Sequence, residues 1–139
     1  MRISPDKRRA ARGVATVEVL VAVAIVMVVG TIGVLTFGNT DRAQVRNEAA
    51  ELGLFLQQTR LRALEGGRPI EIILSGDEGV LQAGGHVFPF SDDIDIAPEA
   101  AQLVLAPAGG SDGLVMSLTK GTQSAQVTLD WLTGRVVVE

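Results

Sequence analysis

The 139-residue chain contains no cysteine and only one histidine, His86. Without thiols, neither a disulfide framework nor a thiolate metal site can form. His86 alone cannot build a histidine-based metal triad, and we expect it on a strand surface. Ser111, in the sequence Gly-Gly-Ser-Asp-Gly, lacks the Gly-x-Ser-x-Gly pattern of a hydrolase nucleophile. No glycine-rich phosphate loop is found. The sequence therefore predicts no enzyme, no cofactor and no metal site.

One long segment has no charged residues, and basic and acidic residues are concentrated in different parts of the rest of the chain. No charged residue occurs from Val19 to Gly38. The first thirteen residues hold five basic residues against one acid, and the rest of the chain holds seven basic against fifteen acidic residues. Because nucleic-acid binding depends on neutralising phosphates, this acidic balance disfavours a nucleic-acid partner.

The uncharged segment has the length of a membrane-spanning helix. Twenty residues in a helix rise about 30 Å, the thickness of a hydrocarbon core. The basic cluster before it predicts a cytoplasmic amino terminus, with everything after Gly38 outside the inner membrane. A cleaved secretory signal fits less well, because the apolar run is long and no small-x-small site follows it. A generic single-span anchor fits the length.

Neither of these two interpretations explains Glu18, which lies at the start of the apolar run. A charged side chain inside a membrane helix costs about 2.5–3.5 kcal/mol at the centre and less near the interface. Such residues usually have a function or a partner. Glu18 therefore requires a specific explanation.

The segment RGVATVEVLVAVAIVMVVGTIGVL resembles the processing and anchor motif of type IV pilins and type II secretion pseudopilins. In that family a basic leader ends in glycine, a membrane aspartyl peptidase cuts after it, and the new terminal amine is methylated. The resemblance implies cleavage between Gly13 and Val14 and N-methylation of Val14. Glu18 then lies at the fifth mature position, the family spacing. Valine replaces the phenylalanine that is commonest at the first mature position.

The resemblance also gives Glu18 a role in assembly. In the family, this carboxylate pairs with the free amine of a neighbouring subunit in a stack of parallel helices. In a low dielectric, such a pair is strongly preferred over either charge alone. Glu18 would thus set the register of assembly, as a buried polar residue does in a coiled coil.

The segment after Gly38 keeps a helical pattern up to Gly66. Either a new helix begins at 39–41 or one helix runs through. The expected buried stripe is Ala49, Leu52, Leu56, Thr59 and Ala63, flanked by Val45 and Phe55, with the charged residues Arg42, Arg46, Glu48, Glu51, Arg60 and Arg62 mainly on other faces. Gly66-Gly67, followed by Pro69, predicts the helix end.

The remaining residues, 68–139, read as short strands and turns. Expected strands are 68–74, 80–83, 86–90, 94–97, 103–106, 114–118, 125–129 and 135–138, with turns at 75–79 and 132–134. The predicted fold is α+β: a long N-terminal helix packed on a C-terminal antiparallel sheet domain. We expect the sheet to be a meander, in which strands consecutive in sequence are neighbours. The predicted organisation is a leader at 1–13, a membrane or filament-core helix at 14–38, an amphipathic periplasmic half at 39–67 and the β domain.

Two further stretches resemble one subgroup of the family. LFLQQTRLRALEGGRPIEI and LDWLTGRVVV are similar to the helix end and the terminal hairpin of H-type minor pseudopilins and FimT-type minor pilins. The resemblance does not extend to the region 75–111. This region holds Asp77, Glu78, Asp92, Asp93 and Asp95, which we interpret as solvated acids because their spacing fits no EF-hand calcium loop. Trp131 is expected as a core or edge anchor.

Three functional hypotheses follow. The first is a minor pseudopilin in the periplasmic pseudopilus tip of a type II secretion system, anchored by a single pass in a bacterial inner membrane. Its partners would be the major and other minor pseudopilins, the prepilin peptidase, the inner-membrane assembly platform and the secreted cargo. The second is a FimT-like minor pilin that serves assembly or DNA uptake. The third is a membrane-tethered periplasmic binding domain that never assembles, which predicts no processing at Gly13 and indifference to Glu18→Ala.

Overall fold

The computed structural model describes residues 7–139, with side chains described for 16–29 and 40–139. The backbone forms one long helix, α1 (Lys7–Gly66), followed by eight strands. It divides into two units, Met1–Phe37 and Gly38–Glu139. Residues 39–41 are helical, so α1 is continuous at this point and no new helix begins there.

The eight strands have nearly the predicted bounds. They are β1 (Ile70–Ser75), β2 (Val80–Ala83), β3 (His86–Pro89), β4 (Asp95–Ala97), β5 (Ala100–Leu105), β6 (Leu114–Lys120), β7 (Gln123–Leu129) and β8 (Val136–Val138). The first strand begins at residue 70, two residues later than predicted, because the chain must first leave the helix. Gly67 takes a left-handed φ of 57°, and Pro69 offers no backbone N–H to a ladder.

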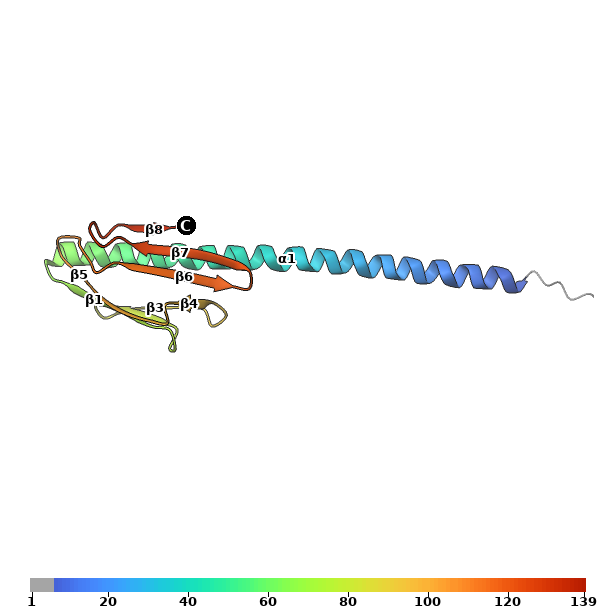
Figure 1. The fold of residues 1–139 in the computed structure, drawn as a ribbon, viewed down its shortest axis with the longest axis horizontal. Coiled ribbons are helices and arrows are strands. Elements are labelled where there is room, and N and C mark those ends of the chain that lie inside the picture. Colours follow the sequence, from blue (N-terminus) through green and yellow to red (C-terminus); the bar gives the residue numbers. More distant parts are fainter. Residues whose placement is uncertain (1–6) are drawn as a thin grey trace, which may run out of the picture. The chain divides into compact units, whose positions relative to one another are not determined.

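The strands form two antiparallel sheets, so the predicted single meander is wrong. One sheet has the order β3-β2-β1-β5 and the other β4-β6-β7-β8 (Figure 1). The hairpins β1–β2, β2–β3, β6–β7 and β7–β8 follow the chain, but β5 returns to pair with β1 and β4 pairs with β6. Gly84 and Gly85, with φ of 55° and 84°, form the two-residue turn of the β2–β3 hairpin.

The core of the second unit lies between α1 and the inner faces of both sheets. Every residue of the predicted helix stripe is buried, and so is Val45. The two sheets contribute alternate side chains, as expected for strands with one face covered. They are Ile72, Leu74, Leu81, Ala83, Leu103 and Leu105 from one sheet, and Leu114, Met116, Leu118, Ala125, Val127 and Leu129 from the other.

Strand β8 lies against the helix at Gly53. A β-carbon placed on Gly53 would be 2.8 Å from Cγ2 of Val138 and 3.8 Å from Cγ1 of Val136. A glycine inside a helix is unfavourable by about 1 kcal/mol relative to alanine. Here the missing side chain makes room for the last strand, which explains why a poor helix former occupies this position.

We predict that Gly53→Leu destabilises the second unit although leucine is the better helix former. Overpacking of a filled site costs about 1–3 kcal/mol, because the new side chain must displace Val138 and with it β8. Gln58→Leu, on an exposed turn of the same helix, is the matched control. Urea unfolding of the full chain in detergent micelles, followed by circular dichroism, measures both. Equal stability of the two variants would contradict this role of Gly53.

Candidate assembly site

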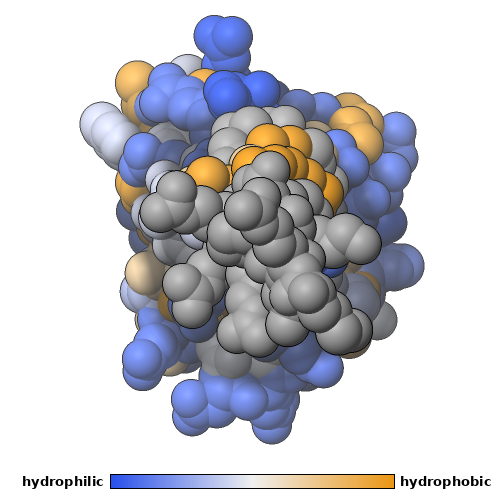
Figure 2. Space-filling model, turned by 90° about the vertical axis from the view of Figure 1, so that its right-hand side faces the viewer, coloured by the Kyte–Doolittle hydropathy of each residue, from blue (hydrophilic) through white to orange (hydrophobic). Residues whose placement is uncertain are grey.

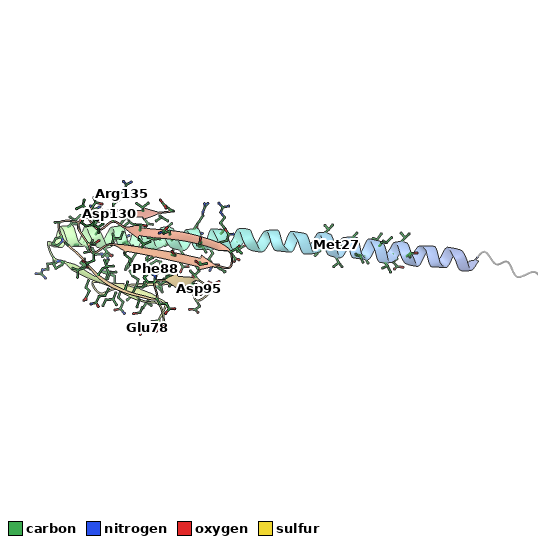
Figure 3. The ribbon with its side chains drawn as sticks, viewed as in Figure 1. Met27, Glu78, Phe88, Asp95, Asp130 and Arg135 are labelled. Atoms are coloured by element: carbon green, nitrogen blue, oxygen red, sulfur yellow. The ribbon has the colours of Figure 1, made fainter. Side chains whose placement is uncertain are left out.

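Within the first unit, the described side chains make an apolar surface on all sides of the helix. Each large apolar side chain from residue 17 to residue 29 is exposed, and Met27, labelled in Figure 3, belongs to this set. A helix that is apolar all round is stable where lipid or other helices cover it. This stretch of α1 therefore needs a cover that the described residues do not supply.

Glu18 is the one charged residue among side chains 16–29, and it is exposed. Neither of the ion pairs in the described part of the chain includes it. Gly13 and Val14 belong to α1, but their side chains lie outside the described ones, so cleavage and methylation there stay predictions. Residues 1–6 of the expected leader lie outside the described residues.

A search of the described residues finds no helix of sufficient length and hydropathy to cross a membrane. The predicted span, 14–38, includes 14, 15 and 30–38, whose side chains lie outside the described ones.

In the second unit, a charge cluster joins three separate segments. The Lys120 ammonium, at the end of β6, lies 3.5 Å from an Asp41 carboxylate oxygen on α1 and forms an ion pair with Asp93 in the loop before β4. Lys120 Nζ also donates to Gln44 Oε1 (2.6 Å), and Gln44 Nε2 donates to Asp93 Oδ1 (2.9 Å). The hydrogen bond from Lys120 and the positive charge hold the pKa of Asp93 below its usual value, although desolvation opposes them. The same bond raises the pKa of Lys120.

A buried carboxylate on α1 fixes the same loop, and the sequence did not predict it. Glu48 is only 8% exposed. Its Oε1 accepts a hydrogen bond from the Ser91 backbone N–H (2.7 Å), and its Oε2 accepts from Ser91 Oγ (2.6 Å). Glu48 directly precedes Ala49 of the buried stripe, a position at the stripe's edge that could have indicated this contact.

The acidic residues of 75–111 do not form a metal centre among the described side chains. Asp92 and Asp95 are exposed, as expected for solvated acids, whereas the exposed Asp93 is held by Lys120 and Gln44. Glu78 and Asp95, labelled in Figure 3, line a depression of about 510 Å³ together with Asp77, Asp92 and Glu99. His86 is exposed on β3, as predicted. Ser111 serves the fold, because its Oγ accepts from the Gly113 N–H (3.0 Å).

The turn between β7 and β8 is closed by Asp130. One of its carboxylate oxygens accepts from the Thr133 N–H (2.7 Å), the Thr133 hydroxyl (2.8 Å) and the Leu132 N–H (3.0 Å). These bonds, those from Thr133 first, lower the pKa of Asp130. Asp130 N–H also donates to the carbonyl of Arg135 (2.9 Å), and both residues are labelled at this turn in Figure 3.

The prediction for Trp131 is wrong. Its side chain is 64% exposed, because the Asp130 turn directs both Trp131 and Leu132 away from the core.

On the face shown in Figure 2, hydrophilic side chains cover most of the coloured surface, and hydrophobic ones appear in separate patches. Isolated exposed apolar residues are common on soluble surfaces and do not by themselves mark a site.

Comparison with solved structures identifies a pilin-like fold. Two crystal forms of the type IV minor pilin FimU of Pseudomonas aeruginosa match the chain at 16% identity. The first has a TM-score of 0.59 and aligns over 72% of this chain and 91% of FimU. The second has a TM-score of 0.51 and aligns over 67% and 90%. No protein-family model matches the sequence, and no curated protein matches it.

Replacing Glu48 by glutamine should destabilise the second unit. Glu48→Gln keeps the shape but turns one acceptor into a donor that faces a Ser91 donor. The loss of a hydrogen bond to a buried charged group costs about 1–3 kcal/mol in unfolding free energy. Glu78→Gln, at an exposed acid in the β1–β2 turn, is the control and should change stability little. Urea unfolding distinguishes them, and indistinguishable midpoints would remove the role given to Glu48.

The Asp93 ion pair predicts a specific acid sensitivity. Because the folded-state pKa of Asp93 lies below the reference value of 3.8, its contribution to stability is present above that pH and is lost as pH falls through the folded value. The melting temperature of Asp93→Asn should therefore fall less steeply on acidification below pH 3.8 than that of the wild-type chain. Asp92→Asn, an exposed neighbour, is the control. Parallel curves for all three would show that the pair contributes nothing, as many exposed pairs do.

Proposed function

We propose that the chain is a minor subunit of a pilin-type filament, processed between Gly13 and Val14 and held before assembly by the helix at 14–38. The observation that carries this proposal is Glu18, an acid placed in an all-round apolar helix, five residues after Gly13, in a chain with a pilin-like fold. The fold alone supports only the class of protein. The spacing of Gly13 and Glu18 supports processing and assembly.

The proposed chemistry follows from removal of the leader. Cleavage creates an ammonium group at Val14, one turn of helix before Glu18. In the apolar surroundings that this helix requires, either charge alone is costly, whereas the two together from neighbouring subunits compensate each other. The glutamate of one subunit thus selects the position of the next one along the filament. Methylation of the amine keeps its charge.

Among pilin-type filaments, we propose the type II secretion pseudopilus, with this chain as an H-type minor pseudopilin. The resemblances at 54–72 and 129–138 support the group that H-type minor pseudopilins share with FimT-type minor pilins, and the acidic balance after residue 38 favours the pseudopilin within it. The partners are then the major and other minor pseudopilins, the prepilin peptidase, the inner-membrane platform and the secreted cargo. The chain would lie in a bacterial inner membrane with residues after Gly38 in the periplasm.

A type IV pilus is the second candidate, because the solved structures with a similar fold are those of a type IV minor pilin. A DNA-uptake role within that pilus is disfavoured by the acidic balance after residue 38, seven basic against fourteen acidic residues. Deleting the inner-membrane assembly platform of each system in turn separates the candidates. The chain should leave the filament fraction extracted from the cell envelope only when the platform of its own system is missing.

Processing provides the direct test of the proposed class. In cells with an active prepilin peptidase, mass spectrometry of the purified chain should find a methylated Val14 at the amino terminus. Gly13→Leu should leave the leader attached, because glycine admits the extended backbone to the protease without obstruction. An intact Met1 in the wild-type chain would contradict the proposal and favour the tethered binding domain.

Glu18→Gln tests the step after processing. The variant leaves the neighbour's amine unpaired, so its recovery in filaments extracted from the cell envelope should fall by at least about tenfold when it competes with the wild-type chain. Glu78→Gln, an exposed acid at the β1–β2 turn, should assemble normally. If the glutamine variant at position 18 assembles as well as wild type, the pairing mechanism is wrong even where processing occurs.

A further inference from the structure

The face of α1 that points away from the core carries a second regular stripe, which we call the outer seam. Its members are spaced alternately four and three residues apart, and all are exposed. They are Ala43, Asn47, Ala50, Leu54, Gln57, Leu61 and Leu64. The three leucines are 57%, 55% and 43% exposed. The described residues leave this stripe uncovered.

This spacing is the heptad pattern of a coiled coil. Asn47, Leu54 and Leu61 fall at a positions, and the remaining seam residues at d positions. The buried Val45, Leu52 and Thr59 then occupy the f position, directly opposite the seam. One helix therefore serves two partners: its inner face packs on the sheets, and its outer face has the period that suits another helix.

Charges flank the outer seam in complementary order. Arg46 and Arg60 lie at g positions, and Glu51 and Glu65 lie at e positions, each five residues further along. The two ion pairs in the described part of the chain both involve Lys120, so none of these four takes part in one. Side chains meet within one helix at spacings of three or four, so a spacing of five does not favour pairing inside the chain.

A second copy of the chain fits these charges in one orientation. In a parallel pair, each g residue meets the e residue five positions on in its partner. Arg46 then faces Glu51 of the second copy, and Arg60 faces Glu65 of the second copy. In an antiparallel pair, arginine would meet arginine and glutamate would meet glutamate. The charge order therefore favours parallel association.

The surface beside the seam can receive a partner's side chains. A cavity of about 390 Å³ on one side is lined by Gln57, Arg60 and Leu61 of α1 together with Val136 of β8. On the other side, a cavity of about 420 Å³ includes Ala43, Asn47 and Glu51. Within the described chain, the buried Arg60 Nε has no hydrogen-bond acceptor. A carboxylate from a second copy near the rest of this guanidinium would offset its charge.

We propose that residues 43–64 pair in parallel with the same residues of a second copy. The inference deepens the proposed filament function and rests on it for the common direction of the two anchors, which parallel pairing requires. The second copy lies side by side with the first and is not the neighbour whose Val14 amine pairs with Glu18, because that contact requires a shift of about one helical turn. Asn47 at an a position would set the register. The seam spans only three heptads, so pairing should be weak in dilute solution and should gain from the high effective concentration of anchored subunits.

The absence of cysteine makes the proposal directly testable. Leu54→Cys is introduced into the full chain, expressed as two differently tagged copies, and oxidised in isolated membranes with copper phenanthroline. The control is Val87→Cys on β3, which is 54% exposed. Facing a positions approach within disulfide reach, so we expect about tenfold more mixed-tag dimer at position 54 than at position 87. Equal yields at the two positions would overturn the proposal.

Charge exchange tests orientation and register. In the Leu54→Cys background, Arg46→Glu should reduce cross-linking, because it places an acid opposite Glu51 of the second copy. Adding Glu51→Arg should restore the yield, since each copy then offers the exchanged pair. Residues five apart do not meet within one helix, so a local structural effect would not be rescued. Failure of the double variant to recover would overturn parallel pairing in this register.

The same samples separate this inference from the function on which it rests. Amino-terminal mass spectrometry is performed on the cross-linked and free chains. Processed, filament-borne chain without cross-linking at position 54 would overturn the outer-seam pairing and leave the filament function intact. Cross-linking with full charge rescue in a chain that keeps its leader would support the pairing and contradict the filament function.

Discussion

The structure depends on one constraint: a helix of 60 residues must find cover for apolar surface that differs along its length and around its circumference. In the second unit, the chain covers one face of α1 with its own sheets, and Gly53 makes room for the last strand. In residues 16–29, the apolar surface extends around the helix, and the described residues do not cover it. What the chain cannot cover itself, lipid or another subunit must, and this need links the fold to assembly.

The second unit shows how a small domain fixes itself to such a helix. The buried stripe of α1 provides most of the contact between the helix and the sheets, and polar groups fix the position of the loops. Glu48 holds the backbone and hydroxyl of Ser91, while Lys120 joins the β6–β7 hairpin to Asp41 and to the loop at Asp93. Both polar contacts connect residues more than 25 positions apart in sequence. The sheets therefore have a fixed register on the helix, which leaves its outer face defined and accessible.

Sequence patterns predicted the elements well and their arrangement less well. Helical spacing identified the buried stripe, and alternation identified β6 and β7, because burial of one face imposes a period on the residues themselves. Short apolar runs between turn residues indicated the other six strands. The same period does not say which strands are neighbours, so the pairing of β1 with β5 and the division into two sheets were missed. Glu48 was assigned to an outer face because its type suggested solvent, and Trp131 to the core or the sheet edge because its type suggested burial. In both cases specific hydrogen bonds decided the outcome: those that Ser91 donates to Glu48, and those that Leu132 and Thr133 donate to Asp130.

The residues of the outer seam can be found in the sequence, but the buried stripe on the same helix gives the stronger apolar pattern. Only the exposed fractions of the side chains in the structure distinguish the two stripes. For the candidate assembly residues, the sequence supplied the positions of Gly13, Val14 and Glu18, and the fold supplied the class of protein.

The central claim is that residues 16–29 exchange lipid for neighbouring subunits. Nitroxide labels on single cysteines through this segment, read for oxygen accessibility before and after filament assembly, test it most directly. The account predicts high accessibility at every position in bilayers and a marked loss on assembly. Unchanged accessibility, or access by a water-soluble quencher before assembly, would contradict it.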